Sequence, residues 1–136
     1  MRDLYASSPN PANCAYCVVR PGGLSDGEAD GPSQVHVSQG DYYTAEISRT
    51  DVAEVSVAAL LNKSTDFTTF ELNKMKGLNA ATDTVPKPPD ALVHAGSKEY
   101  AGLFDGLVTD KVMKEKYPVY INDFRGDGLK PLSSLV

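Results

Sequence analysis

The apolar positions of the chain form recognisable patterns up to about Lys74 and weaker ones after it. Residues 15–19 (AYCVV) are apolar and β-branched on both sides of an expected strand, which predicts a buried strand of a parallel sheet. Residues 67–72 (FTTFEL) alternate between apolar and polar types and predict another strand. Shorter strands are predicted over residues 34–37 and 41–47.

The strongest helix signal begins at Ser48. Ser48 and Asp51 have the S-x-x-D spacing of a capping box, in which the serine oxygen accepts a backbone N–H and the carboxylate caps back. The predicted helix runs to about Leu61, and its interior holds only Glu54 and Ser56 as polar residues. A helix this apolar is expected to be covered on most of its circumference.

The patterns in the second part of the chain are less regular. Three prolines within residues 84–90 predict a linker or an extended arm. Helices are plausible over residues 97–104 and 109–117, and the tail from Asp123 is expected to be loose.

The order of elements predicts an α/β layered domain. Residues 3–9 could form a helical turn, followed by the buried strand, the short strands, the capped helix and the strand at 67–72. A strand buried on both faces needs neighbouring strands and helices that this order does not provide, which suggests a missing half. We therefore divide the chain into a partial domain, residues 1–74, and an irregular, partly helical extension, residues 75–136.

Length and charge limit the function classes. The 136 residues carry a net charge of −5, which argues against the clustered basic residues of a nucleic-acid-binding protein. No run of about 18 apolar residues predicts a membrane span, and the N-terminus lacks the apolar stretch of a secretory signal. Two cysteines suggest a soluble protein of a reducing compartment, cytoplasm or organelle interior.

Cysteine and histidine positions do not predict a metal site. Cys14 and Cys17 form C-x-x-C along an expected strand, so we interpret them as buried and unpaired rather than as a redox pair. His36 and His94 could complete a four-ligand zinc site, but their spacing fits no zinc pattern. No general base can be assigned to either histidine.

Other polar and aromatic groups keep two interpretations each. The acidic loop with Asp26, Glu28 and Asp30 is expected to be solvated, because it lacks the glycine and terminal glutamate of an EF-hand. Tyr42 and Tyr43 either pack on the sheet, which we favour, or line a pocket.

Three segments in this order resemble a known family. AYCVVRPGGL, then ISRTDVAEVSVAALL, then TFEL resemble the second half of atypical short-chain dehydrogenases/reductases with NmrA-like or epimerase-like organisation, which bind NAD(P). The resemblance covers residues 1–74 and implies the C-terminal half of a doubly wound, Rossmann-type parallel sheet. It also implies that the loop after the first strand lies beside the nicotinamide. The implied cofactor-binding residues are Arg20, Pro21, Gly22, Gly23 and Leu24.

The chain departs from this family at its two most diagnostic motifs. The Gly-rich phosphate loop is absent, and without it the pyrophosphate loses its backbone donors. Tyr-x-x-x-Lys is also absent, since the nearest pattern, Tyr16 to Arg20, lies along a strand and has the wrong cation. No catalytic residue is therefore assigned. Arg49 either reaches a substrate or cofactor anion or is solvated or paired, and Pro21, Gly22 and Gly23 either approach the nicotinamide or only end the strand.

Two functions follow, with a third possibility beside them. In the first, the chain is part of an NAD(P)-dependent atypical reductase, with NAD(P) implied by the resemblance, and is not catalytic by itself. In the second, it is a non-catalytic interaction or structural protein derived from that fold, without a cofactor, which docks on a partner through residues 75–136 or buries its exposed sheet edge and faces by self-association. The third is a fragment of a longer reading frame, favoured by Met1 falling within an expected helix.

Overall fold

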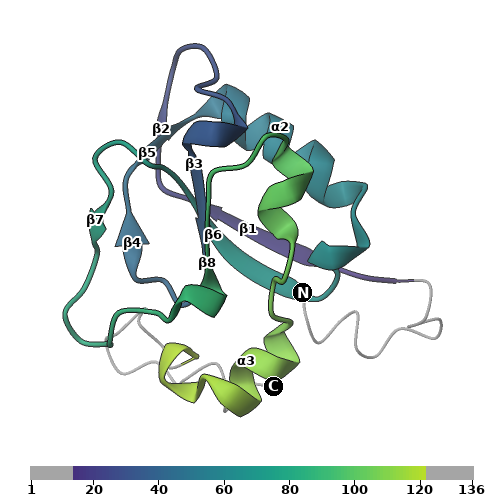
Figure 1. The fold of residues 1–136 in the computed structure, drawn as a ribbon, viewed down its shortest axis with the longest axis vertical. Coiled ribbons are helices and arrows are strands. Elements are labelled where there is room, and N and C mark those ends of the chain that lie inside the picture. The colour runs from purple at the N-terminus through teal and green to yellow at the C-terminus, as the bar shows by residue number, and fades with distance from the viewer. Residues whose placement is uncertain (1–13, 122–136) are drawn as a thin grey trace.

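The computed structural model describes residues 14–121, which form an α/β fold around a mixed four-stranded sheet (Figure 1). The strand order is β1 (Cys17–Pro21), β6 (Thr68–Lys74), β3 (Val35–Ser38) and β8 (Val93–Ala95). β1 runs parallel to β6, whereas β3 is antiparallel to both β6 and β8. The α/β class is confirmed, and the sheet is mixed rather than wholly parallel.

The two faces of the sheet differ in chemistry. Phe70 and Leu72 of β6 are fully buried on one face, where the helix α2 (Arg49–Leu60) and the 3-10 helix η5 (Tyr100–Phe104) pack against them. The intervening residues Glu71 and Asn73 are also buried but polar, and they lie on the opposite face because side chains alternate along a strand. The apolar face holds the main core, and the polar face holds the candidate site.

The start of α2 confirms the predicted cap. Ser48 Oγ accepts a hydrogen bond from the backbone N–H of Asp51 at 3.0 Å. The Asp51 carboxylate does not close the box on Ser48 N–H as expected. Instead it accepts hydrogen bonds from the backbone N–H groups of Asp30 and Gly31 and thereby ties the acidic loop to the helix.

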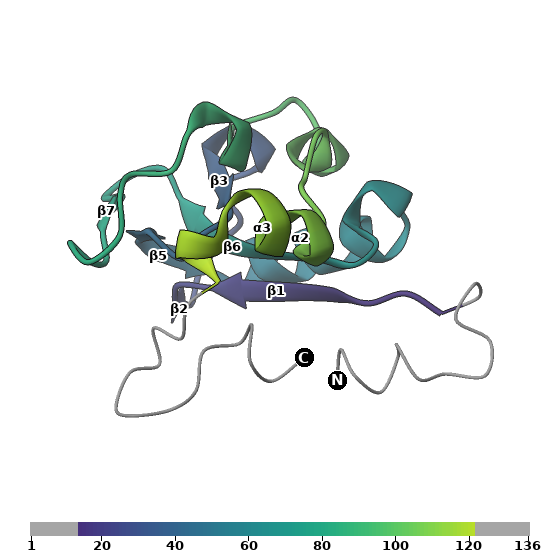
Figure 2. The same cartoon turned by 90° about the horizontal axis from the view of Figure 1, so that it is seen from below.

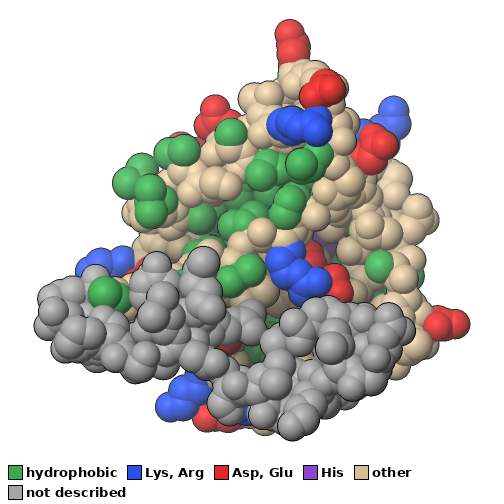
Figure 3. Space-filling model, turned by 180° about the vertical axis from the view of Figure 1, so that it is seen from behind, with side chains coloured by type: hydrophobic (Ala, Val, Ile, Leu, Met, Phe, Trp, Pro, Cys, Tyr) green, Lys and Arg blue, Asp and Glu red, His purple; other side chains and the backbone are tan. Residues whose placement is uncertain are grey.

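The expectation that this helix is covered on most sides was wrong. Asp51, Val55 and Ala59 form its buried stripe. Val57 is 59% exposed and Leu60 is 85% exposed, so the outer side of the helix is also apolar and lies open. Figure 3 shows hydrophobic side chains gathered on the face of the molecule seen from behind. Apolar residues lie on both sides of this helix, but within residues 14–121 only the inner side packs against other elements.

The expectation that residues 15–19 form a strand buried on both faces was also wrong. The strand begins at Cys17, stands last in the sheet order among the described strands, and is only half-buried from Cys17 to Arg20. Cys17 and Val19 pack against the core. Arg20 lies on the other face, which is polar. The apolar run therefore belongs to a strand with one apolar face.

Residues beyond Lys74 contribute to the same sheet and core. β8 was not predicted from the sequence, and Leu103 and Phe104 of η5 are buried in the main core. The helix predicted over 109–117 is confirmed as α3 (Asp110–Lys116), which lies beside η6 (Pro118–Tyr120) (Figure 2). The helix predicted over 97–104 is the shorter 3-10 helix η5.

The remaining elements are short. The strand predicted over 41–47 is divided into β4 (Tyr43–Thr44) and β5 (Glu46–Ser48), which pair with β7 (Asn79–Ala80) and β2 (Gly23–Ser25) respectively. The other 3-10 helices are η2 (Pro32–Gln34), η3 (Lys63–Thr65) and η4 (Asp90–Leu92). The helical turn at 3–9 and the tail from Asp123 lie outside the described residues. No helix between residues 14 and 121 has the length and apolarity needed to cross a bilayer.

Candidate functional site

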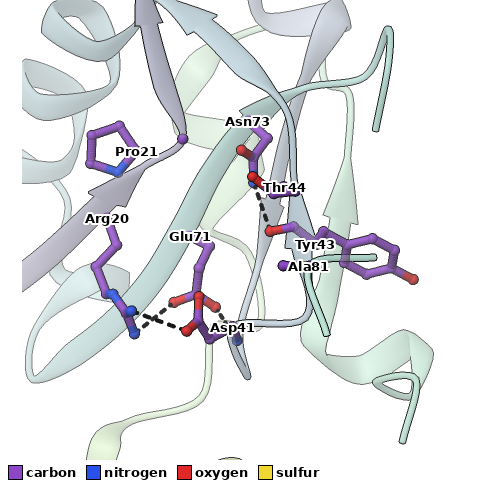
Figure 4. A pocket seen from close by; sticks show the side chains of 9 residues that line it. Arg20, Pro21, Asp41, Tyr43, Thr44, Glu71, Asn73 and Ala81 are labelled. Atoms are coloured by element: carbon purple, nitrogen blue, oxygen red, sulfur yellow. Dashed lines mark hydrogen bonds and ion pairs between the residues drawn. The ribbon is translucent and has the colours of Figure 1, made fainter. Parts of the chain in front are cut away.

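A small pocket of about 130 Å³ opens beside the carboxyl ends of the parallel strands β1 and β6 (Figure 4). Arg20, Pro21 and Gly22 line it from β1 and the turn that follows. Glu71 and Asn73 line it from β6. The remaining lining residues come from neighbouring segments: Asp41, Tyr43, Thr44 and Ala81. In sheets with parallel strands, ligands bind outside the carboxyl ends of the strands.

Three charged side chains meet in this pocket. Arg20 and Glu71 are direct partners in the β1–β6 register. One guanidinium nitrogen of Arg20 lies 3.2 Å from the Asp41 carboxylate, and the other lies 3.7 Å from Glu71 Oε2. Glu71 Oε1 also accepts a hydrogen bond from the backbone N–H of Asp41 at 2.6 Å. Figure 4 shows the side chains of Arg20, Asp41 and Glu71 pointing toward one another from β1, from the turn after β3 and from β6 respectively.

The backbone of the turn after β3 brings Asp41 to Glu71. Gly40 has a φ of 111° and Asp41 has a φ of 56°, so the chain reverses through the left-handed region. Glycine is well suited to its position, because a Cβ there would also meet the ring of Tyr120. This reversal points the N–H of Asp41 at Glu71 and its carboxylate at Arg20.

Glu71 is the most perturbed acid of the site. Burial raises its pKa to about 7, although the N–H groups of Asp41 and Gly40 and the charge of Arg20 act in the opposite direction. The charge of Asp41 adds to the rise. A carboxyl group with this pKa exchanges protons near neutral pH, which is the range that acid–base and ion-binding sites need.

We expect Glu71 to make the stability of the protein depend on pH. Its pKa in the folded state lies above the ordinary 4.5, so its contribution is fully present below pH 4.5 and is lost as the pH rises through about 7. The total loss is about 3 kcal/mol. Urea unfolding of the wild type and of Glu71→Gln at pH 5 and pH 8 measures it.

In this experiment the Glu71→Gln variant, which cannot ionise, loses this part of the pH dependence. Glu46→Gln removes an exposed carboxylate and serves as the control, with the wild-type pH profile expected. Equal pH profiles for the wild type and Glu71→Gln would show that Glu71 titrates normally.

Gly22 and Asn73 form the structural floor of the pocket. The N–H of Gly22 donates to the carbonyl of Leu72 at 2.9 Å, and Asn73 Oδ1 accepts from the N–H of Ala45 at 2.9 Å. A Cβ on Gly22 would overlap the carbonyl oxygen of Ala45 and the amide oxygen of Asn73. Glycine is therefore required here for close packing of the chain against itself. Gly23 has only an ordinary contact near it.

The sequence-predicted residues are only partly brought together. Arg20, Pro21 and Gly22 line the pocket, whereas Gly23 and Leu24 lie in β2 and do not. Arg49 pairs with exposed Asp26, 2.6 Å away, and is not among the pocket residues. Sequence reasoning missed the residues that give the pocket its charge, Asp41 and Glu71. Glu71 stands at an alternating polar position of the predicted strand, and no sequence pattern shows that this side of the strand is buried.

The cysteines and histidines lie elsewhere and form no shared site. Cys14 and Cys17 are half-buried and are not joined by a disulfide, and burial raises the pKa of the Cys17 thiol. Burial lowers the pKa of His36 and His94, and for His36 the nearby His94 adds to the effect. Within residues 14–121, no group of three or more possible ligands is placed to hold a metal ion.

Tyr43 fulfils both of the interpretations that the sequence left open. Its ring makes an edge-to-face contact with His36, with centroids 4.9 Å apart, and another with Tyr42. The same residue lines the pocket. Packing on the polar face of the sheet thus supplies one wall of the site.

Comparison with known proteins adds no relative: no family model matches the chain, and no curated protein matches it significantly.

Proposed function

We propose that this chain is the C-terminal part of an NAD(P)-binding, atypical reductase-like protein and supplies one wall of its nicotinamide pocket. The observation that carries the proposal is the pocket at the carboxyl ends of the parallel pair β1 and β6, lined by Arg20, Pro21 and Gly22. Ligands of Rossmann-type sheets bind at this edge. The proposal includes the finer fold assignment, the C-terminal half of a Rossmann-type sheet.

The size of the pocket supports a partial site. Its volume of about 130 Å³ is well below the 300–1,000 Å³ typical of complete ligand sites. This volume suits the nicotinamide end of a dinucleotide and provides no binding site for the adenosine and the pyrophosphate. The absence of a Gly-rich phosphate loop from the sequence agrees with this. We therefore propose that the isolated chain is not catalytic.

When bound, the cofactor supplies hydride transfer to or from a small carbonyl or alkene substrate. The chain's own contribution is to orient the ring and to shield it from water. Pro21 and the backbone of Gly22 would flank the ring, and the half-buried cluster of Arg20, Asp41 and Glu71 would meet its polar substituent. Leu24 and Arg49 have no part in this pocket.

A comparison of two reduced cofactors tests the proposal. We expect reduced nicotinamide mononucleotide and NADPH to bind this chain with similar, millimolar affinity, a binding free energy of about −4 kcal/mol. The reason is that only the nicotinamide end of each molecule has a binding site on this chain. Nicotinamide fluorescence measures both titrations, and AMP is the matched control that should not compete. Micromolar binding of NADPH by a monomer would show a complete cofactor site and contradict the partial-site proposal.

A second function is favoured by one specific observation. The outer side of α2, with Val57, Leu60 and Leu61, is apolar and exposed, and exposed apolar surfaces of this kind mark interaction sites. We propose as the alternative a non-catalytic protein that docks on a partner or on itself. Size-exclusion chromatography of the titration sample separates the two functions. A stable oligomer without nicotinamide binding supports the alternative, and a monomer with nicotinamide binding contradicts it.

A further inference from the structure

The charges of the pocket are not balanced within the described part of the chain. Two carboxylates, Asp41 and Glu71, share the single guanidinium of Arg20. Asp41 holds it more closely, at 3.2 Å against 3.7 Å. With Glu71 ionised, this cluster carries one net negative charge, and the carboxylate of Glu71 is itself buried, which is costly unless a cation compensates it.

Among residues 14–121, the surroundings of Glu71 supply no second cation for this charge. The charged groups that face it among residues 14–121 are Arg20 from β1 and Asp41 from the turn after β3. From β3, Ser38 is its direct partner in the register and is uncharged. Ser38 is 1% exposed, and its hydroxyl has no hydrogen-bond partner in this part of the protein. The polar face beside Glu71 is thus incompletely satisfied as well as short of positive charge.

Glu71 can nevertheless be reached. It lines the pocket, and its side chain keeps 6% of its surface exposed. Its Oε1 accepts the N–H of Asp41, the N–H of Gly40 also donates to the carboxylate, and Arg20 lies 3.7 Å from Oε2. A small donor that enters the pocket could therefore hydrogen-bond to this second oxygen.

From this arrangement we infer that the pocket is a binding site for a small organic cation, held by the carboxylate of Glu71 beside the Arg20–Asp41 pair. The cation brings the number of positive groups to two, equal to the number of carboxylates. Glu71 binds it in the ionised form, so the ligand displaces the proton that Glu71 otherwise holds. The charge of −5 on the whole chain favours the approach of such a ligand. This inference does not depend on the nicotinamide proposal.

Methylguanidinium and N-methylurea are matched probes, because they have nearly the same shape and differ in charge, with a carbonyl oxygen in N-methylurea where the cation has an amino group. We expect methylguanidinium to bind and N-methylurea not to. The affinity of methylguanidinium should rise about tenfold from pH 6 to pH 8, because it follows the ionisation of Glu71, whose pKa is about 7. Isothermal titration calorimetry in buffers of different ionisation enthalpy measures both the affinity and the release of nearly one proton per ligand at pH 6.

Three variants locate the site. Glu71→Gln should abolish the preference for the cation and its pH dependence. Asp41→Asn should weaken binding, because Arg20 then loses the carboxylate of Asp41 and can move toward Glu71. Glu46→Gln removes an exposed carboxylate from the same end of the molecule and should bind as the wild type does. Amide NMR spectra establish that each variant is folded.

Equal binding of the two probes would overturn the inference, and so would a folded Glu71→Gln variant that retains the affinity. The oxidised nicotinamide ring is itself a small organic cation. Comparing the binding of 1-methylnicotinamide with that of neutral nicotinamide shows whether the pocket takes this ring or only guanidinium-type cations. Failure of the cofactor titrations with methylguanidinium still binding would reject the cofactor proposal alone.

Discussion

Replacing Gly22 with alanine should destabilise the protein by about 3 kcal/mol. The new Cβ would overlap the backbone carbonyl of Ala45 and the side-chain oxygen of Asn73. Neither can move freely, because Asn73 Oδ1 accepts the N–H of Ala45 and is 1% exposed as a residue. The backbone of the turn would therefore have to shift, and the pocket wall would shift with it. Urea unfolding followed by circular dichroism measures the loss.

The neighbouring glycine provides a matched control for this substitution. A Cβ on Gly23 would meet only Glu46 Cγ at 3.8 Å, an ordinary contact. Gly23→Ala should therefore leave the free energy of unfolding within about 0.5 kcal/mol of the wild type. If both alanine variants are equally stable, the tight packing of Gly22 against the segment at Ala45 is not present in solution.

Asp51→Ala should be at least as damaging, with an expected loss of about 3–5 kcal/mol. Asp51 is fully buried and gathers four donors: Ser48 Oγ, Tyr100 Oη and the N–H groups of Asp30 and Gly31. Alanine would leave these donors without their acceptor. The same equilibrium unfolding measurement applies, with Glu54→Ala, on an exposed position of the same helix, expected to stay within about 0.5 kcal/mol of the wild type.

The stabilisation by Asp51 also has a defined pH dependence. Burial alone would raise its pKa, but the hydrogen bonds from Tyr100, Asp30, Ser48 and Gly31 outweigh it and hold the pKa below the ordinary 3.8. This contribution is fully present above pH 3.8 and is lost as the pH falls through the lower value of the folded state. An Asp51→Ala variant as stable as the wild type at pH 7 would contradict this account of the buried cluster.

Local patterns predicted the elements whose cause is local. The Ser48 cap fixed the start of α2, and the alternation from Phe67 fixed most of β6. β8 escaped prediction because Val93–Ala95 is only three residues long and owes its pairing to β3, which is distant in the sequence. The exposure of Leu60 also could not be foreseen, since apolar residues do not reveal whether a partner surface exists.

The candidate site was predictable only on one side. The family resemblance implies cofactor contacts from Arg20 to Leu24, and of these residues Arg20, Pro21 and Gly22 line the pocket, whereas Gly23 and Leu24 do not. Glu71 looked like an ordinary solvent-facing residue of an alternating strand, and its burial depends on the segments that cover the polar face. Asp41 reaches it only through the left-handed turn at Gly40. These are contacts between segments distant in the sequence, and no local spacing pattern predicts them.

The central claim, that a nicotinamide-sized ligand binds at the carboxyl ends of β1 and β6, is tested most directly by residue-resolved NMR. Reduced nicotinamide mononucleotide is titrated into ¹⁵N-labelled protein, with AMP in a parallel sample. The account predicts that amide shifts change at Arg20, Gly22, Asp41 and Asn73 with the mononucleotide and do not change with AMP. Shift changes confined to other surfaces, or none up to about ten times a millimolar Kd, would contradict it.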